Sequence, residues 1–435
     1  MMIKNKLKIF FLLILSICLL MSGCARTTTE VVDENSVTLK FMGWEASPLE
    51  TEAVKKGLET FMEQHPNIKV EYIPVPEDQY HSKLLTMLTG NAAPDVFFLG
   101  SSDYRIFQKR GVLLDLTSYF NEEYSLDEFI DSAAEIMEIN DKIFGVSSCT
   151  VSPVIYYNKN LFDDAGLPYP PSDPESAWSW QEFIEVAKKL TIKEENNVVQ
   201  YGVHGFEDIY MASALMLSND GYPFNEDFTQ SMFNKPEIKE VLQAIADLRL
   251  TEGVAPSASV LENMGMGPSQ MLQTGKVAMI IDGSWALQEL AKMGFPVGVA
   301  VLPKFKEALT HGQAHVHAAA ANTKHPNEAW KLISFLSSEE YQIQLIKEGL
   351  WMPNRKALYT EDGVAKWYNN EVHPENFDQM IPYFSDAVAY PHVFVTDNVV
   401  GTIITEELDN FFHGGEAIDV VTEKIDKRVA EELSR

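Results

Sequence analysis

Cysteine, positive charge and long apolar runs are all scarce in this chain of 435 residues. Three cysteines are too few for a disulfide scaffold, so an exported protein of this length would depend on an apolar core. Hydrophobic residues at 46% and aromatics at 11% can supply one. The patterns G-x-S-x-G, H-E-x-x-H and G-x-x-x-x-G-K-[ST] are also missing, which excludes the common nucleophile-elbow, zinc-protease and P-loop enzymes.

Basic residues are outnumbered by acidic ones, 34 to 63, which gives a formal net charge of −29. A charge of this sign repels phosphate backbones and anionic lipid headgroups, so nucleic acid is excluded as a partner. It does not exclude a neutral solute, and it favours solubility.

The one long apolar run lies at the N-terminus, where three lysines precede Ile9–Leu20. Twelve residues span about 18 Å, too short for a bilayer of about 30 Å, so residues 1–23 are predicted to be a signal peptide. Ser22-Gly23-Cys24 resembles a lipobox with Met21 in place of the usual leucine, which predicts lipidation of Cys24. Simple secretion is the alternative. With Cys18 removed and Cys24 acylated, Cys149 would have no intramolecular disulfide partner.

The remaining 412 residues are enough for two lobes. Residues 24–37 are rich in Thr, Glu and Asp and are predicted to be a flexible tether. The segments "VTLKFMGW", "IKVEYIPV" and "DVFFLG" are typical of strands, and the amphipathic segments between them are typical of helices. This alternation predicts a parallel sheet, with ligands at the carboxyl ends of its strands.

A second set of strands and helices follows "VIYYNKNLF". It includes helical "WQEFIEVAKKL", strand-like "YGVHGF", helical "PEIKEVLQAIADLRL" and "GKVAMIIDGSW". The extended stretch "FPVGVAVLPKF" then precedes two further helices and a largely helical C-terminus. Two α/β units joined by repeated crossings predict a cleft between them and a hinge motion that closes it.

In order and spacing, these segments, with "FMGWEA", "LTGNAAPDVFFLGSSD", "HPNEAWKLISFL" and "MPNRKAL", resemble the family 1 extracellular solute-binding proteins. These are sugar-binding lipoproteins of ABC importers of the maltose-binding-protein type. The resemblance implies an α/β, two-lobe periplasmic-binding-protein type II fold with a hinge and an interlobe ligand cleft. Its N-lobe would comprise 38–148 and 304–350, and its C-lobe 149–303 and 351–435.

Sugar recognition needs carboxylates for hydroxyl groups and aromatic rings for C–H faces. Trp44 and Glu45 follow the first strand and match the family's first ligand loop, although Trp44 could instead be a core aromatic. The resemblance also implies a hydroxyl-binding acid at Asp103, for which a helix N-cap is the alternative role.

In the second unit the resemblance implies Glu207 and Tyr210, with Asp208 as an alternative to Glu207. The glycine of "DGSW" permits a tight turn that would bring Trp285 to the strand's carboxyl end, where the family has its stacking tryptophan; a core role is the alternative. Further candidates are Tyr156 beside the predicted hinge, with a structural role as the alternative, and Trp351 and Arg355. These complete the ligand-binding set.

The stretch "HGQAHVHAAAA" places His311, His315 and His317 close together. Histidines at i and i+2 on a strand point the same way and could bind zinc. No Asp, Glu or Cys accompanies them, so surface or hinge histidines are favoured, and no metal or cofactor is predicted.

The sequence therefore predicts a monomeric, non-enzymatic receptor that captures a sugar or oligosaccharide and delivers it to the transmembrane subunits of an ABC permease. A lipid anchor would hold it on the outer face of the cytoplasmic membrane, in a Gram-positive cell. An exported glycoside hydrolase and a binding protein for a non-sugar solute are the alternatives. The identity, length and linkage of the sugar are not encoded in any motif that we recognise.

Overall fold

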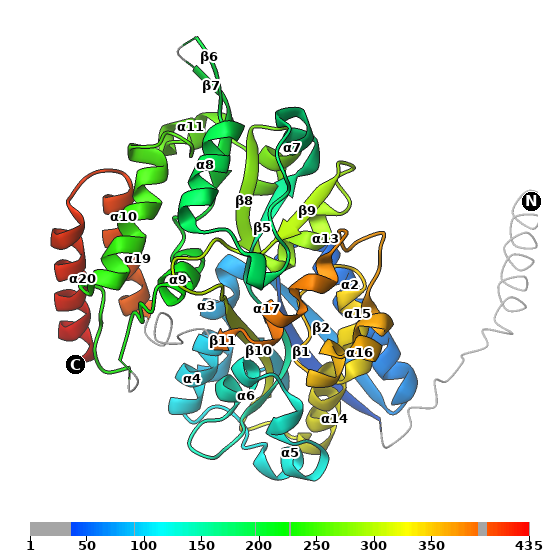
Figure 1. Ribbon diagram of the computed structural model, residues 1–435. Coiled ribbons are helices and arrows are strands. Elements are labelled where there is room, and N and C mark those ends of the chain that lie inside the picture. The colour runs from blue at the N-terminus through cyan, green and yellow to red at the C-terminus, as the bar shows by residue number, and fades with distance from the viewer. Residues whose placement is uncertain (1–35, 91, 196, 226–227, 390–397, 435) are drawn as a thin grey trace, which may run out of the picture. The chain divides into compact units, whose positions relative to one another are not determined.

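Two β-sheets organise the chain, and each collects strands from separate stretches of the sequence (Figure 1). The computed structural model describes residues 36–90, 92–195, 197–225, 228–389 and 398–434. The predicted signal peptide and Cys24 lie outside the described residues. Everything from Thr38 onward belongs to one unit, within which both sheets lie.

The first sheet has the strand order β11-β10-β3-β1-β2, with β4 also paired to β10. Strands β1 and β3 are parallel, as the alternation of strands and helices predicts, whereas β10 runs antiparallel to both β3 and β4. The sheet is therefore mixed. Its strands are β1 Val37–Glu45, β2 Ile68–Pro76, β3 Val96–Leu99, β4 Gly145–Val151, β10 His311–Ala319 and β11 Val388–Ala389.

The second sheet has the order β6-β7-β8-β5-β9, in which β7 and β8 are parallel and β5 is antiparallel to both of its neighbours. Its strands are β5 Pro153–Asn158, β6 Ile192–Glu194, β7 Asn197–His204, β8 Val277–Gly283 and β9 Val297–Ala300. The chain passes from the first sheet to the second between β4 and β5, and returns between β9 and β10. These crossings are where the sequence predicts a hinge.

Helices surround both sheets. Those up to β5 are α2 Pro48–Gln64, α3 Glu77–Thr89, α4 Ser101–Lys109, α5 Thr117–Glu123, η1 Leu126–Glu128 and α6 Asp131–Met137. Those from β5 to β9 are α7 Lys159–Ala165, η2 Pro174–Ser176, α8 Trp180–Leu190, α9 Ile209–Ser218, α10 Pro236–Leu250, α11 Ala258–Met264, α12 Pro268–Gln273, η3 Ser284–Ala286 and α13 Leu287–Leu290. The rest are α14 Pro326–Leu336, α15 Glu339–Ile346, η4 Lys356–Tyr359, α16 Glu361–Trp367, η5 Phe377–Met380, α17 Ile381–Ser385, α19 Asn398–Phe412 and α20 Ile418–Leu433.

Local sequence explains where several of these helices begin. Helix α8 starts at a capping box, in which the Ser179 hydroxyl accepts the Glu182 amide and the Glu182 carboxylate accepts the Ser179 amide. Helix α2 starts after Ser47, whose hydroxyl accepts the Glu50 amide, with Pro48 at its first position. This start fixes Glu50 in the first turn of α2, a position that matters for the site below.

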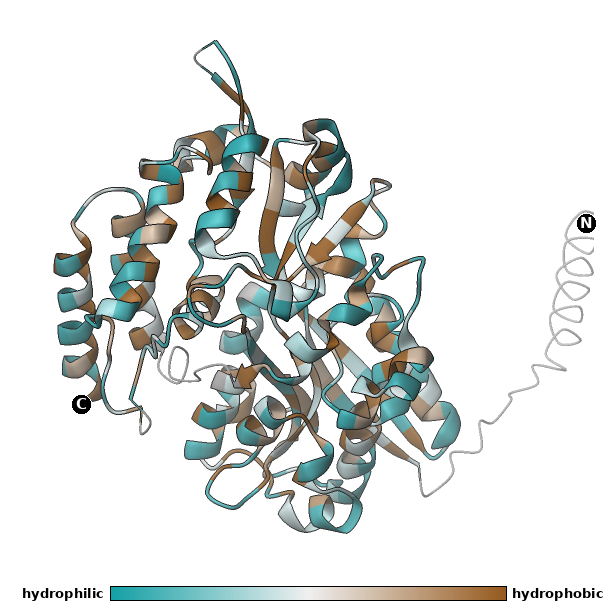
Figure 2. Cartoon of the chain, in the orientation of Figure 1, coloured by the Kyte–Doolittle hydropathy of each residue, from teal (hydrophilic) through white to brown (hydrophobic). Residues whose placement is uncertain are grey.

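Apolar residues fill the sheets and the inner helix faces, so the strands appear brown and the outer helix faces largely teal in Figure 2. All four residues of β3 are buried, as expected of a strand packed on both faces. A large apolar cluster surrounds the second sheet and includes side chains from α10, α17, α19 and α20. Helices α10 and α20 pack against each other although 182 residues separate their starts, Pro236 and Ile418.

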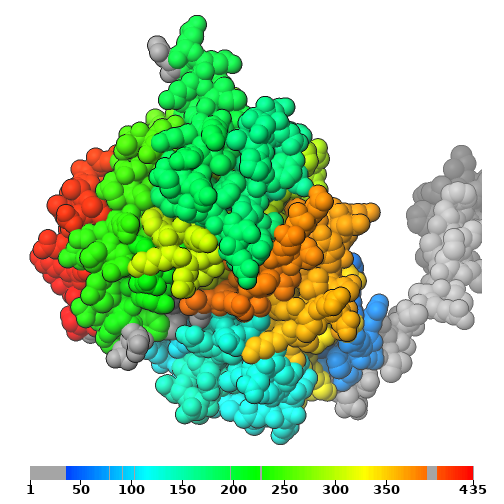
Figure 3. All heavy atoms as spheres, in the orientation of Figure 1, coloured from blue at the N-terminus to red at the C-terminus, as the bar shows by residue number. Residues whose placement is uncertain are grey.

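The division into six segments stays a prediction, and so do the five boundaries between them. The strands group differently near one of them, because β4 runs through the predicted boundary at 148 and 149 and pairs with the first sheet along its length. The segment after α15 also returns to the first sheet, where Met352 bridges Thr150 of β4. Figure 3 shows the orange surface of the chain near residue 380 between the cyan and green surfaces.

Candidate ligand-binding site

A cavity of about 770 Å³ opens between the two sheets. Its lining includes the carboxyl ends of β1, β3, β7 and β8, where ligands collect in α/β sheets. Six of the predicted ligand residues line it: Trp44, Asp103, Glu207, Tyr210, Trp285 and Trp351. The sequence therefore brings together side chains that lie up to about three hundred residues apart.

On the first-sheet side, Trp44 is held by aromatic contacts. Its ring meets Phe98 edge to face, with centroids 4.7 Å apart, and His315 likewise at 4.8 Å. Its half-buried side chain leaves part of the ring for a ligand. Asp103 lies in the first turn of α4, and one of its oxygens is 2.6 Å from Nδ1 of His81. Gly100 occupies the N-cap of that helix, so Asp103 does not cap it.

Trp351 completes this side. Its ring stacks on Phe98 at 5.6 Å and 14°, and only 6% of the residue is exposed. Its φ of +65° lies in the left-handed region, which costs a bulky residue roughly 1–3 kcal/mol. Such strain persists only where surrounding packing fixes it, and here it presents a tryptophan to a cavity wall.

On the second-sheet side, Trp285 stands in η3, just after β8. A Cβ placed on Gly283 would lie 2.1 Å from the Trp285 ring, so only glycine lets the indole fold back over the strand end. Trp285 is half-buried, and its ring centroid is 5.7 Å from that of Tyr210. The Tyr210 hydroxyl donates to the Val151 carbonyl at 2.9 Å, which links α9 to the end of β4.

Acidic side chains accompany these aromatics. Glu207 accepts from Nη2 of Arg249 at 2.7 Å and from the Gly205 amide at 3.3 Å. Asp208 is the N-cap of α9 and accepts the Tyr210 amide at 2.7 Å. Both line the cavity, so the sequence alternatives Glu207 and Asp208 are neighbours in one wall.

Three carboxyls that the sequence analysis did not select also line the cavity, those of Glu50, Glu77 and Asp282. Burial, together with the nearby Glu77 and Glu45 carboxylates, raises the pKa of Glu50 to about 8. Burial likewise raises the pKa of Asp282 to about 6, with Glu289 and Asp208 adding to the shift. The signal for Asp282 was its place beside Trp285 in "DGSW" at the end of a strand.

Similarity to known proteins agrees with this architecture. The model of the bacterial extracellular solute-binding proteins matches residues 47–343. The chain belongs to this family. An uncharacterized lipoprotein of Streptomyces antibioticus is 28% identical over 342 residues, covering 77% of this chain and 73% of that protein. A galactooligosaccharide-binding protein of Bacillus subtilis is 21% identical over 367 residues, covering 82% of each.

The fold is shared with solved structures. An ABC substrate-binding protein from Listeria monocytogenes, in complex with cycloalternan, superimposes with a TM-score of 0.80 at 23% identity. The match covers 92% of this chain and 99% of that one. The two-lobe α/β fold expected from the sequence is thereby confirmed, and the chain is a solute-binding protein of the extracellular type and not a member of an enzyme family. Among the described residues, no helix has both the length and the apolar character needed to cross a bilayer.

Three predicted ligand residues of this solute-binding protein do not line the cavity. Glu45 accepts the Thr51 hydroxyl at 2.9 Å, at the start of α2. Tyr156 is 1% exposed in β5, and its hydroxyl donates to the Gly283 carbonyl at 3.2 Å, which is the structural role that the sequence left open. It supports the turn that positions Trp285.

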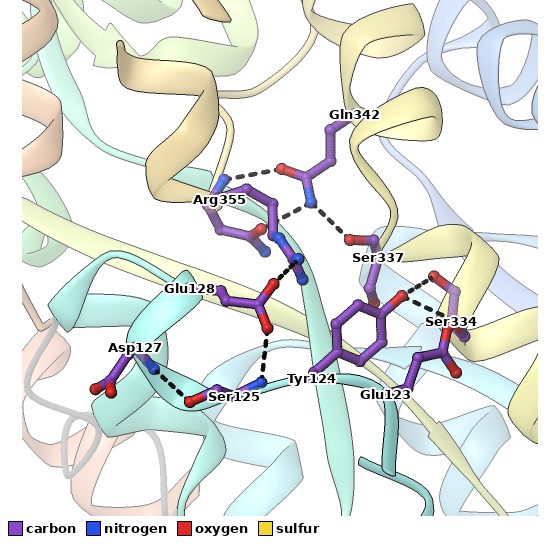
Figure 4. A network of polar contacts seen from close by, with 10 residues as sticks. Glu123, Tyr124, Ser125, Asp127, Glu128, Ser334, Ser337, Gln342 and Arg355 are labelled. Carbon is purple, nitrogen blue, oxygen red and sulfur yellow. Dashed lines mark hydrogen bonds and ion pairs between the residues drawn. The ribbon is translucent and has the colours of Figure 1, made fainter. Parts of the chain in front are cut away.

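Arg355 is the third, and it belongs to a polar network behind the first sheet (Figure 4). Its Nη2 donates to Glu128 at 2.5 Å, and its guanidinium lies 4.7 Å from the ring centroid of Tyr124 and 4.5 Å from that of Phe129. Arg355 is only 7% exposed, and it anchors the segment that follows Met352, the residue that bridges β4. Its neighbour Asn354 extends the network to α15 through hydrogen bonds with Gln342.

The three histidines of β10 are buried, so the expectation of a surface position is wrong, whereas the hinge alternative stays a prediction. His311, His315 and His317 are 0%, 6% and 2% exposed, because β10 is a central strand with helices and rings on both faces. Burial lowers the pKa of His311 to about 4 and the pKa values of His315 and His317 to about 3, so all three are neutral at pH 7. His315 lines the cavity. Within the described ranges no group of three or more His, Cys, Asp or Glu is arranged to hold a metal ion.

Proposed function

We propose that this solute-binding protein captures a carbohydrate between its two sheets and delivers it unaltered to the transmembrane subunits of an ABC permease. The observation that carries the proposal is the cavity of about 770 Å³ with Trp44, Trp285 and Trp351 in its walls beside several carboxylates. Flat indole rings suit the C–H faces of sugars, and carboxylates accept hydrogen bonds from neighbouring hydroxyls. The oligosaccharide named for the relative in Bacillus subtilis, and the cycloalternan in the Listeria structure, support the same ligand class.

The crossings between the sheets support a hinge motion. Binding would shift an equilibrium between open and closed forms, since a ligand held by both walls contacts both only when they approach. Tyr210 would take part in this closure because it lines the cavity and also contacts Val151 beside a crossing. The closed form would then be the one that the permease recognises.

The proposal extends to location. A signal peptide ending at Gly23 and an acylated Cys24 would attach the protein, as a monomer, to the outer face of the cytoplasmic membrane of a Gram-positive cell. Support comes from the Ser22-Gly23-Cys24 sequence and from the similarity to a protein described as a lipoprotein. Replacing Cys24 with alanine would release the protein into the medium. Membrane retention of that variant would contradict the lipid anchor.

Calorimetric titration of the purified protein with a panel of mono- and oligosaccharides tests the binding function. We expect at least one carbohydrate to bind with a stoichiometry near one and to be recovered intact by chromatography. Recovery of shortened sugars would indicate a glycoside hydrolase, and failure of every carbohydrate to bind would favour a non-sugar solute. A thermal-shift screen should precede it, because ligand at 100 times its dissociation constant stabilises the folded state by about 2.7 kcal/mol.

A further inference from the structure

Acids predominate among the ionisable side chains that line the cavity, although Glu50, with its pKa raised to about 8, is mainly uncharged at pH 7. Among the described residues, no lysine or arginine lines it, whereas six carboxylic acids do. These are Glu50, Glu77, Asp103, Glu207, Asp208 and Asp282. Three histidines are the remaining titratable groups, and burial lowers the pKa values of His204 and His315, which keeps both neutral at pH 7.

Protein groups neutralise only part of this charge. Arg249 pairs with Glu207, and His81 pairs with Asp103, whose hydrogen bond raises the pKa of that histidine. In the described part of the chain, Asp208 and Asp282 have no ion-pair partner. Asp208 instead acts on Asp282 as a like charge, which adds to the raised pKa of Asp282. These two acids thus concentrate negative charge near Trp285 without a cation paired to either in the described part of the chain.

Two hydrogen-bond donors of the cavity walls are already engaged within the protein. The Tyr210 hydroxyl donates to Val151, and the Gln313 amide donates to Ser101 at 3.4 Å. His315 provides an independent observation, because it is 94% buried, its ring lines the cavity, and its Nδ1 has no partner among the described residues. A neutral imidazole offers one acceptor and one donor, so the unpartnered Nδ1 can serve a ligand in either role. The carboxylates of Asp208 and Asp282 add acceptors for a ligand that donates.

Ligand classes differ sharply in what they can supply. A carboxylate or phosphate only accepts hydrogen bonds and adds negative charge, whereas a hydroxyl both donates and accepts. A protonated amine has only donors and carries a positive charge. It would also gain from an aromatic face such as that of Trp285. A sugar with a free amino group meets each of these conditions in one molecule.

Resting on the proposed carbohydrate function, we propose that the preferred ligand is an amino sugar whose protonated nitrogen lies between Asp208 and Asp282, beside Trp285. Neutral sugars would bind more weakly through the same rings and acids, and uronic acids would bind most weakly. The site would thus select by charge as well as by shape.

Matched sugars test the proposal by calorimetric titration at pH 7 and low salt. The sets are glucosamine, glucose and glucuronic acid; galactosamine, galactose and galacturonic acid; and the β-1,4 glucosamine dimer with cellobiose. We expect at least one amino sugar to bind ten times or more tightly than its parent, and to lose affinity as salt rises from 20 to 500 mM. If no amino sugar binds more tightly than its parent, including the case in which only neutral sugars bind, the inference is overturned and the carbohydrate function stands. Binding of putrescine but no sugar would overturn both, and so would binding of no probe.

Two isosteric variants assign the nitrogen's position. Asn caps helices as well as Asp, and its side-chain oxygen can still accept the Gly283 or Tyr210 amide, so Asp282→Asn and Asp208→Asn remove charge without removing these hydrogen bonds. Each should weaken the amino sugar about tenfold and its parent less than threefold. Asp164→Asn, at an exposed site on α7, is the matched control and should change neither. Equal losses for both sugars would mean that these acids serve hydroxyls alone, which would refute the inference.

Discussion

The cavity and the network around Arg355 are both rich in carboxylates, but they treat charge differently. In the network, Glu128 accepts from Arg355 and from the Ser125 amide (Figure 4). Glu123 accepts from the Ser334 hydroxyl, and also from the Trp330 indole at 2.9 Å. In the cavity, burial raises the pKa values of Glu50 and Asp282, and neighbouring carboxylates add to both shifts although each acid also accepts a backbone hydrogen bond. A protein optimised for stability alone would not retain that arrangement.

The hydrogen-bond partners of an acid distinguish structural polar residues from those that face a ligand. Partnered acids close their hydrogen bonds inside the protein and contribute to folding. Acids that face a cavity and have raised pKa values can still form hydrogen bonds or ion pairs with a ligand. Experiments can test this distinction. Substitutions in the network should alter stability alone, whereas substitutions in the cavity should alter binding.

The largest effect is expected from Trp285→Ala. Tryptophans at the centre of a binding site typically contribute 2 kcal/mol or more, so carbohydrate affinity should fall about thirtyfold or more, measured by calorimetric titration. The ring is half-buried at the end of a strand, so the folded state should persist by circular dichroism. Tyr222→Ala, which truncates a ring that is 57% exposed, is the control. Wild-type affinity in the Trp285 variant would remove this residue from the site.

Glu50→Gln should change how stability depends on pH. The pKa of Glu50 is raised from its ordinary value of 4.5 to about 8 in the folded state, so between these pH values the unfolded chain releases a proton that the folded chain retains. Ligand-free wild-type protein should therefore lose stability as pH rises from 5 to 8, by more than about 2 kcal/mol from this group.

Glutamine cannot ionise, so the variant should lose less stability over that range in urea denaturation at each pH. The exposed Glu59→Gln on the same helix provides the comparison and should follow the wild type. Parallel pH profiles for wild type and Glu50→Gln would show that the Glu50 carboxyl does not titrate in this range.

Part of the fold and of the cavity lining could be predicted from the sequence. Strand and helix segments were predictable because alternation, helical periodicity and caps such as Ser179 are local signals. Trp44, Asp103 and Trp285 were predictable because the carboxyl ends of strands face the cavity. The parallel pairing of β1 and β3 followed from the same alternation.

The features that the sequence could not predict are the orientation of single side chains and their burial. Arg355 was selected as a ligand residue, but no sequence pattern shows that its side chain turns toward Glu128 and two aromatic rings. The β10 histidines were expected at the surface or the hinge because no Asp, Glu or Cys accompanies them, and their burial follows only from the central position of β10. Glu50 was missed since its burial depends on Glu77, Trp44 and the start of α2 meeting in space.

Arg355→Ala should be the clearest test of the network. It removes a charge-assisted hydrogen bond and two ring contacts from a residue that is 7% exposed, so we expect a loss of about 2 kcal/mol in the free energy of unfolding. Carbohydrate affinity should stay within threefold of wild type, because Arg355 does not line the cavity. Arg355→Lys keeps the charge but not the planar fork, and should recover only part of the loss. A large fall in affinity with unchanged stability would return Arg355 to the ligand site.

The smallest effect is expected from Lys56→Ala. Lys56 pairs with Glu348 at 3.3 Å, but its side chain is 64% exposed and that of Glu348 is 33% exposed. Water already solvates both groups, so the pair should contribute less than about 0.5 kcal/mol to the free energy of unfolding. Chemical denaturation of Lys56→Ala and Arg355→Ala therefore separates the effect of ion pairing from the effect of burial. Equal losses of stability would mean that ion pairing alone stabilises both sites. A much smaller loss for Lys56→Ala would show that burial among aromatic rings makes the Arg355 pair structural.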